Sequence, residues 1–142
     1  MALLNDEAKQ VLVNQLMRHE GVELNLYQCT AGKQTIGVGR NLDDMGITQD
    51  EAMYLLNNDV ERVEEELKKN IHFLSGLSDN RKIVLINMAF NLGINRLLKF
   101  KNMLGALGQH DYAAAADEML NSKWAEQVGS RANELAENMR TG

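Results

Sequence analysis

The spacing of apolar residues changes twice within the first fifty residues of this chain. Over about 3–19 they recur every three or four positions, which predicts an amphipathic helix that ends near Gly21. Between 22 and 40 apolar and polar residues alternate, which predicts a small β-sheet with a hairpin turn at 31–33. Helical spacing then returns, so the fold has to accommodate a short antiparallel sheet between helices.

The remainder of the chain is predicted to be helical. Thr48-Gln49-Asp50-Glu51 is a capping box, and it starts a helix that reaches about Asn70 and is long enough to bridge two lobes. The segment IVLINMAFNLG is apolar nearly all round, as expected for the central helix of a helical lobe, with Asn87 and Asn91 one turn apart. Shorter helices are predicted at about 95–107, 110–121 and 129–139.

These elements predict an α+β, mostly helical fold in a single domain of 142 residues. We expect a small β-hairpin lobe at about 20–47, a bridging helix at 48–70, and a larger helical lobe made of 1–19 and 71–142. No run of about 18 apolar residues is present, so we expect no stable membrane insertion. The first twenty residues lack the features of a secretory signal, so we expect synthesis in the cytoplasm.

Charge and cysteine content narrow the classes of function. The net charge of -5 argues against a nucleic-acid binder, which needs a basic surface to neutralise phosphates. The charge is unevenly distributed along the chain. Residues 43–66 include nine acidic residues and one basic residue, Arg62, whereas residues 79–101 include five basic residues and one acidic residue, Asp79. These runs are either solvated helix faces or a docking surface. With one cysteine no internal disulfide can form, and we expect no metal and no cofactor.

Glu20 is the first candidate for chemistry. It continues the apolar side of the first helix and sits at the helix's C-terminal end, where the negative end of the helix dipole disfavours a charged carboxylate. A carboxyl group that retains its proton can act as a general acid. The alternative is an ordinary surface residue before a glycine that ends the helix.

Cys29 and Thr35 follow Glu20 at spacings of nine and fifteen residues. If the hairpin turn centres on Gly32, Cys29 lies directly across from Thr35 on one face of the sheet. Gly37 and Gly39 share that face and leave room for a flat ligand close to the backbone. Taken singly, Cys29 could be a small buried hydrophobe, and Thr35 could reflect β propensity alone.

The segment from His19 to Gly39 resembles the phage lysozymes, also called endolysins or muramidases of glycoside hydrolase family 24. That family carries Glu, eight residues, Asp or Cys, five residues, Thr, and then Ile-Gly-X-Gly. Further similar segments follow in the family's order: Gly46-Ile-Thr-Gln-Asp-Glu-Ala, Asn58-Asp-Val, Ile86-Asn-Met-Ala-Phe-Asn-Leu-Gly, Phe100-Lys-Asn, Ser122-Lys-Trp and Ser130-Arg-Ala through Arg140-Thr-Gly. The resemblance implies a two-lobed lysozyme-like fold and an enzyme acting on bacterial peptidoglycan.

The resemblance also implies roles for individual residues. The family hydrolyses the β-1,4 bond between N-acetylmuramic acid and N-acetylglucosamine with inversion, which requires space for water between two catalytic groups. Glu20 would protonate the glycosidic oxygen, Cys29 would occupy the second catalytic position, and Thr35 would help hold the attacking water.

Four more residues match family positions around the substrate. Gly39, Phe90 and Asn91 match residues that line the cleft and bind substrate. Arg131 matches a basic residue near the family's catalytic glutamate, so the resemblance implies a supporting role for it.

Cys29 differs from the usual aspartate in its chemistry. A thiol has a reference pKa of roughly 8.5 against 3.9 for Asp, so Cys29 is mostly protonated at neutral pH unless its surroundings lower that pKa. It could position water, act through its thiolate fraction, or attack the sugar and give a retained product.

Two other functions remain open from the residues. One is a peptidoglycan amidase or peptidase in which Cys29 pairs with a histidine such as His19. The other is a wall-binding module with a lysozyme fold and no catalysis. New reducing ends indicate sugar cleavage, and new amino termini indicate amide cleavage.

The resemblance further implies a cellular setting. We expect a monomer that accumulates in the host cytoplasm and meets the wall in the periplasm after a membrane pore, a holin, opens. A hydrolase carried on the virion and used at entry is the other setting. Relatives commonly continue beyond Arg140-Thr-Gly, so a short further C-terminal segment is expected.

Overall fold

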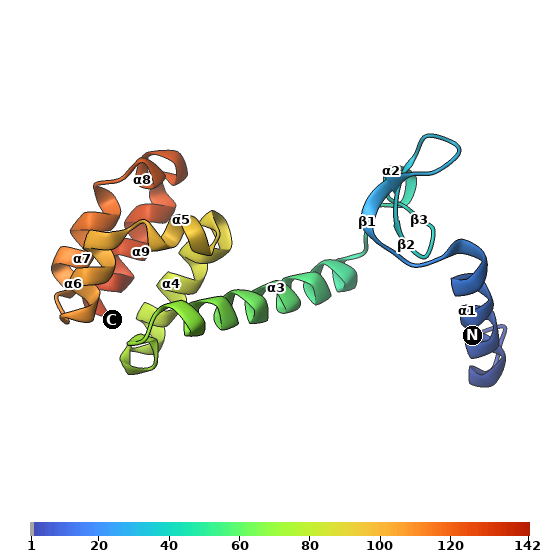
Figure 1. Cartoon of the computed structure of the whole chain (residues 1–142), viewed down its shortest axis with the longest axis horizontal. Helices are drawn as coiled ribbons and strands as arrows, with labels where there is room; N and C mark the ends of the chain where they lie inside the picture. The colour runs from blue at the N-terminus through green and yellow to red at the C-terminus, as the bar shows by residue number, and fades with distance from the viewer. Residues whose placement is uncertain (1) are drawn as a thin grey trace. The chain divides into compact units, whose positions relative to one another are not determined.

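The computed structural model describes residues 2–142 and divides into two compact units, Met1–Met53 and Tyr54–Gly142 (Figure 1). The elements of the first unit are α1 (Asp6–Glu20), β1 (Glu23–Gln28), β2 (Gln34–Gly37), β3 (Arg40–Asn41) and α2 (Leu42–Met45). The long helix α3 (Gln49–Asn70) begins in the first unit and continues into the second. The predicted mostly helical α+β fold is confirmed.

Helix α1 begins three residues later than predicted and ends where predicted. It starts at Asp6 because the side chain of Asn5 accepts a hydrogen bond from the amide of Ala8 at 2.8 Å and caps the first turn. It ends at Glu20, and the amide of Gly21 closes the last turn on the carbonyl oxygen of Met17 at 3.0 Å. The prediction that residues 1–19 share a lobe with 71–142 stays a prediction.

The sheet is antiparallel, in the order β1-β2-β3, and its register differs from the predicted one. Thr35 faces Tyr27, whereas Cys29 lies opposite Lys33 and donates its amide hydrogen to the Lys33 carbonyl oxygen at 2.9 Å. The prediction that Cys29 lies directly across from Thr35 is therefore wrong. The hairpin has a three-residue loop in which Gly32, with φ +79°, is the last residue and not the centre. A register shift by two keeps Cys29 and Thr35 on one face, as diagonal neighbours.

Helix α3 starts at the predicted capping box. The Glu51 carboxylate accepts from the amide of Thr48 at 2.8 Å, and the Thr48 hydroxyl accepts from the amide of Glu51 at 3.1 Å. The helix ends at Asn70, as predicted.

The second unit is helical and contains the hydrophobic core. After the 3-10 turn η1 (Leu74–Gly76) its helices are α4 (Asp79–Leu92), α5 (Ile94–Leu98), α6 (Lys101–Gly108), α7 (Tyr112–Leu120), α8 (Lys123–Val128) and α9 (Ser130–Thr141). Helix α4 buries five residues, as predicted for a central helix. Helix α9 packs on α4, α7 and α8. None of the helices within 2–142 has the length and apolarity that crossing a bilayer requires.

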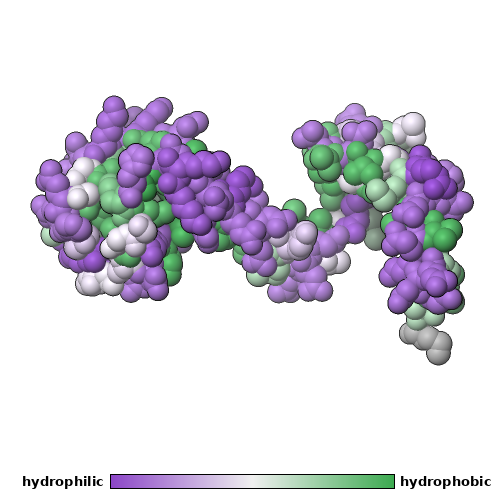
Figure 2. All heavy atoms as spheres, turned by 60° about the horizontal axis from the view of Figure 1, so that its bottom comes forward, coloured by the Kyte–Doolittle hydropathy of each residue, from purple (hydrophilic) through white to green (hydrophobic). Residues whose placement is uncertain are grey.

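Two boundaries in this unit differ from the prediction. The expected helix at 95–107 is two helices, because the chain turns at Lys99 and Phe100. Helix α8 was not predicted, and it forms because the Ser122 side chain caps it by accepting from the amide of Ala125 at 3.1 Å. Hydrophilic side chains cover much of the face of this unit seen in Figure 2, with apolar residues between them in places.

Candidate active site

The carboxyl group of Glu20 lies against the backbone of Gly39. Glu20 is the last residue of α1, and Gly39 lies between β2 and β3. A Cβ placed on Gly39 would stand 3.1 Å from Oε2 of Glu20, and Gly39 has φ +70°. The absence of a side chain therefore serves both the backbone conformation and the approach of the carboxyl group. Within the first unit this brings the candidate acid to the glycine-rich end of the hairpin.

Cys29 and Thr35 form the second part of the candidate site. Thr35, on the central strand, is 2% exposed, and its hydroxyl donates to the Lys33 carbonyl oxygen at 2.9 Å. The half-buried thiol of Cys29 has its pKa lowered, first by hydrogen bonding from the backbone amide of Lys33 and then by the amide of Ala31. The Thr35 hydroxyl lowers the pKa of Cys29 further, so it lies within reach of the sulfur.

The Thr35 hydroxyl has one proton, so its hydrogen bonding depends on the state of the thiol. In this structure the hydroxyl donates to the Lys33 carbonyl oxygen, so donation to the Cys29 sulfur would require the proton to turn away from that carbonyl. Cys29 and Thr35 are diagonal neighbours on one face of the sheet, and the prediction that they act together stays a prediction.

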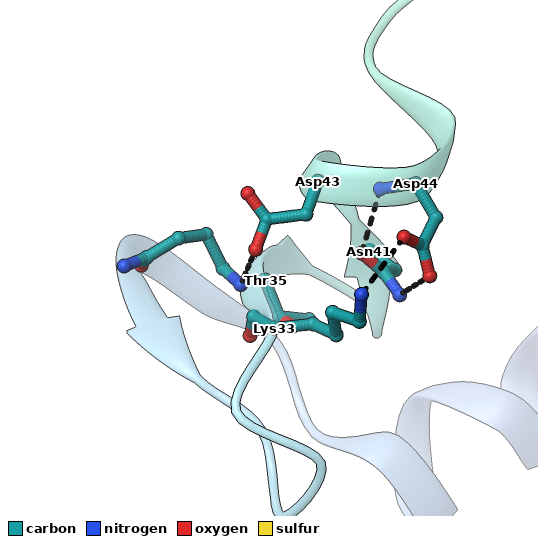
Figure 3. A network of polar contacts seen from close by, with 6 residues as sticks. Lys33, Thr35, Asn41, Asp43 and Asp44 are labelled. Atoms are coloured by element: carbon teal, nitrogen blue, oxygen red, sulfur yellow. Dashed lines mark hydrogen bonds and ion pairs between the residues drawn. The ribbon is translucent and has the colours of Figure 1, made fainter.

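A network of polar contacts holds the hairpin to the segment that follows β3 (Figure 3). The amide of Gln34 donates to Asp43 Oδ2 at 2.8 Å, and Lys33 Nζ contacts Asp44 Oδ1 at 3.2 Å. Asn41 caps α2 by accepting from the amide of Asp44 at 3.1 Å. These contacts hold Lys33 and Gln34, the two residues before Thr35, and the Thr35 hydroxyl donates to the carbonyl oxygen of the first of them.

Arg40 connects the sheet to the start of α3. Its guanidinium group donates two hydrogen bonds to Glu51, at 2.9 and 2.8 Å, and a third to the Gly46 carbonyl oxygen at 3.1 Å. These bonds from Arg40 are the main reason that the pKa of Glu51 falls from 4.5 to about 2, and the amide of Thr48 adds to the effect. The carboxylate of Glu51 thus serves both the capping box and the sheet.

The remaining candidates lie in the second unit. Arg131 of α9 donates to Oδ1 of Asn87 from Nε at 3.0 Å and from a terminal nitrogen at 2.6 Å. Asn91 accepts from the indole nitrogen of Trp124 at 3.0 Å. Phe90 and Arg131 line the same groove, of about 370 Å³, together with Asn87. The two asparagines of α4 therefore orient an arginine and a tryptophan.

No cluster of His, Cys, Asp and Glu within the described residues, 2–142, has an arrangement that could hold a metal ion. The polar groups at the candidate site are the carboxyl group of Glu20, the thiol of Cys29 and the hydroxyl of Thr35.

The sequence profile of the phage lysozyme family matches residues 17–140. This span contains all seven candidate residues. The chain belongs to the phage lysozyme family. It is a lysozyme, an enzyme that hydrolyses peptidoglycan.

Individual relatives of this phage lysozyme come from varied sources. Probable T4-type lysozyme 1 of Dictyostelium discoideum is 30% identical over 87% of this chain and 89% of its own length. An endolysin of Acyrthosiphon pisum secondary endosymbiont phage 1 is 31% identical over 82% of this chain and 80% of its own. The pre-baseplate central spike protein Gp5 of Enterobacteria phage T4 is 26% identical over 97% of this chain but only 29% of its own length.

Sequence reasoning missed residues of this lysozyme that orient the candidates. Asn87 was noted only as a polar interruption of an apolar helix, and its partner Arg131 lies 44 residues away. Asp43 was counted only as part of an acidic run. A polar residue on an otherwise apolar helix is the one signal that could have indicated Asn87, because a buried polar group needs a hydrogen-bond partner.

Proposed function

We propose that this lysozyme hydrolyses the β-1,4 bond between N-acetylmuramic acid and N-acetylglucosamine, with Glu20 as the general acid. The observation that carries the proposal is the placement of the Glu20 carboxyl group over Gly39. A backbone without a side chain leaves space for a sugar ring beside the acid. Glu20 protonates the glycosidic oxygen as the bond to the anomeric carbon breaks.

Cys29 and Thr35 act on the attacking water. Water donates one proton toward the Cys29 sulfur and is held by the Thr35 hydroxyl oxygen while its own oxygen bonds to the anomeric carbon. The lowered pKa of Cys29 supports this role, because a larger thiolate fraction makes the sulfur a better proton acceptor. The expected product is inverted, because water and not sulfur forms the new bond.

Gly39, Phe90 and Asn91 bind the glycan, and Arg131 supports the site. The groove lined by Phe90 and Arg131 supports this assignment, as does the fixed orientation of Asn91 by Trp124. The enzyme acts as a monomer without a metal or cofactor.

The relative named endolysin supports a role in host lysis. In that setting the enzyme accumulates in the host cytoplasm and reaches the wall in the periplasm once a holin has permeabilised the membrane. The spike protein among the relatives supports the alternative of a virion-associated enzyme.

Replacing Glu20 by Gln tests the acid. Gln keeps the shape of Glu but has no acidic proton, so reducing-end release from purified peptidoglycan should fall by at least about a hundredfold. The matched control is Glu61→Gln, an exposed glutamate of α3, which should keep full activity. Full activity of Glu20→Gln, with an unchanged circular dichroism spectrum, would refute the mechanism.

A thiol nucleophile is the second candidate function, and the lowered pKa of Cys29 favours it. Proton magnetic resonance of the first sugar product distinguishes the readings. Inversion supports activated water, retention indicates attack by sulfur on the sugar, and new amino termini without reducing ends indicate an amidase or peptidase.

A further inference from the structure

The peptide unit that joins Lys33 to Gln34 is hydrogen-bonded at both ends. Its carbonyl oxygen accepts from the Thr35 hydroxyl and from the Cys29 amide, each at 2.9 Å. Its N–H points the opposite way, as in any trans peptide, and donates to Oδ2 of Asp43 at 2.8 Å (Figure 3). This one planar group therefore connects a carboxylate to both Cys29 and Thr35.

The carboxylate of Asp43 takes the place of a strand partner. Strand β3 ends at Asn41, which faces Thr35. The residue opposite Gln34 would therefore be Leu42, and Leu42 already belongs to α2. Asp43 supplies the acceptor that a continuing strand would have supplied, and a carboxylate makes a stronger bond to an amide than a neutral carbonyl does.

The main chain of Lys33 also reaches the thiol of Cys29. The amide of Lys33 is the first cause of the lowered pKa of Cys29, and the Thr35 hydroxyl contributes less. The amide and the carbonyl of Lys33 are joined at one Cα, so a rotation of the Lys33–Gln34 unit disturbs the hydrogen bonds of both groups. The bond from Gln34 to Asp43 restrains that rotation.

The Thr35 hydroxyl is directed by the same peptide unit. With its proton donated to the Lys33 carbonyl oxygen, the hydroxyl has its oxygen lone pairs free to accept from water. This is the orientation that the proposed role of Thr35 requires.

The alternative is that Asp43 is an ordinary surface acid. It is exposed and belongs to the acidic run at 43–66, which is typical of a solvated face. A charge alone would act on the thiol in the opposite sense, because a nearby carboxylate disfavours a thiolate. The two roles therefore predict opposite changes at Cys29 when Asp43 is removed.

We propose that Asp43 is a positioning residue for Cys29 and Thr35, an inference that rests on the function proposed for these two residues. Its carboxylate fixes the Lys33–Gln34 peptide unit, which directs the Thr35 hydroxyl and holds the turn against Cys29. Asp43 acts through the main chain, so its loss affects the chemical step rather than the binding of the glycan.

The ionisation of the thiol tests this role without any substrate. Cys29 is the single cysteine of the chain, so the rate of alkylation by iodoacetamide, followed against pH, reports on that thiol alone. Asp43→Ala should move the midpoint of this profile to higher pH, and below the midpoint it should slow alkylation about two- to threefold. Loss of a charge without loss of positioning would move the midpoint to lower pH.

Two matched variants separate the hydrogen bond from the charge. Asp43→Asn removes the charge and keeps an oxygen that can accept from the Gln34 amide, so its midpoint should stay at or below that of the wild type. Asp44→Ala removes the neighbouring carboxylate, which contacts the side chains of Lys33 and Asn41. Its midpoint should not rise.

Hydrogen exchange and kinetics distinguish positioning from stability. The Gln34 amide should exchange at least about fivefold faster in Asp43→Ala, because it loses its acceptor. On purified peptidoglycan this variant should lower kcat about three- to tenfold with KM unchanged, and Asp43→Asn should restore most of the rate. A purely structural role would ease unfolding in urea and leave the alkylation profile in place.

Three results would overturn the assignment: a midpoint of Asp43→Ala at or below the wild-type value, an equal rise in Asp44→Ala, or an equal rise in Asp43→Asn. Release of reducing ends by the wild type, measured in parallel, tests the proposed muramidase activity alone. Midpoints that move as expected, with no reducing ends released by the wild type, would refute that activity and not the positioning of the thiol.

Discussion

Glu20 and Gly39 are so close that a methyl group on Gly39 would lie 3.1 Å from the Glu20 carboxyl oxygen. The acid is the last residue of a helix, and the glycine is part of a tight connection between strands. The position of the proposed proton donor therefore depends partly on a residue that has no side-chain functional group.

Gly39→Ala should lower kcat by about ten- to a hundredfold, because the carboxyl group must move away from the new methyl group. The positive φ of Gly39 adds about 1 kcal/mol of destabilisation. Gly46→Ala is the control, since Gly46 has φ +58° and open space around it. Urea denaturation should show similar losses for the two variants, and reducing-end assays should show the loss of rate only for Gly39→Ala. Equal rates would contradict the proposed contact.

Thr35→Val should raise the pKa of Cys29, because it removes a hydroxyl that stabilises the thiolate. The rate of alkylation by iodoacetamide, followed against pH, should have its midpoint below that of free cysteine in the wild type and at higher pH in the variant. Thr35→Val should also cost about 1 kcal/mol of stability, since the Lys33 carbonyl oxygen loses its hydroxyl donor. Thr30→Val, at an exposed position of the turn, should leave the midpoint in place.

The Arg40–Glu51 pair should make stability depend on pH in the acid range. The pKa of Glu51 is lowered to about 2 in the folded state, so its contribution is fully present above the ordinary value of 4.5. It is lost as the pH falls from there through about 2. Glu51→Gln should therefore have a lower Tm than the wild type at pH 7, and the two values should converge near pH 2.

Glu65→Gln provides the control for that experiment. Glu65 pairs with Lys68 on the exposed surface of α3, where both side chains are about 60% accessible. Its Tm should follow the wild type at every pH, and a gap as large as that of Glu51→Gln would contradict the assignment.

Asn91→Ala should destabilise the second unit by about 1–3 kcal/mol, because the buried indole N–H of Trp124 loses its acceptor. In a Trp124→Phe background, where no N–H remains, the same substitution should cost clearly less. Guanidinium denaturation of the four proteins gives the coupling energy directly. Additive effects would show that Asn91 does not serve Trp124.

Local signals predicted the parts of the fold that depend on neighbours in sequence. Thr48 and Glu51 form their capping box within four residues, so the start of α3 could be read from the sequence. The register of the hairpin could not, because it depended on whether Gly32 is the centre or the last residue of its loop. Cys29 and Thr35 nevertheless share one face of the sheet, as predicted, because the register differs from the predicted one by two residues.

Contacts between distant segments account for most of what the sequence did not predict. The pairing of Arg40 with Glu51 is one example, because it depends on where β3 meets α3. Arg131 and Asn87 are 44 residues apart in the sequence and belong to different helices, α9 and α4. A single sequence has no signal for such pairs, since each of these residues could equally well lie on the surface and be hydrogen-bonded to water.

The donors that stabilise the Cys29 thiolate are chiefly main-chain amides of the hairpin turn, from Lys33 and Ala31. Main-chain groups remain when a side chain is replaced, so an aspartate at this position would meet the same amides. The amides of the turn would therefore stabilise a negative charge at this position whether a sulfur or an oxygen atom bears it. A lineage could exchange one acidic group for the other here in a single substitution, without rebuilding the strand on either side.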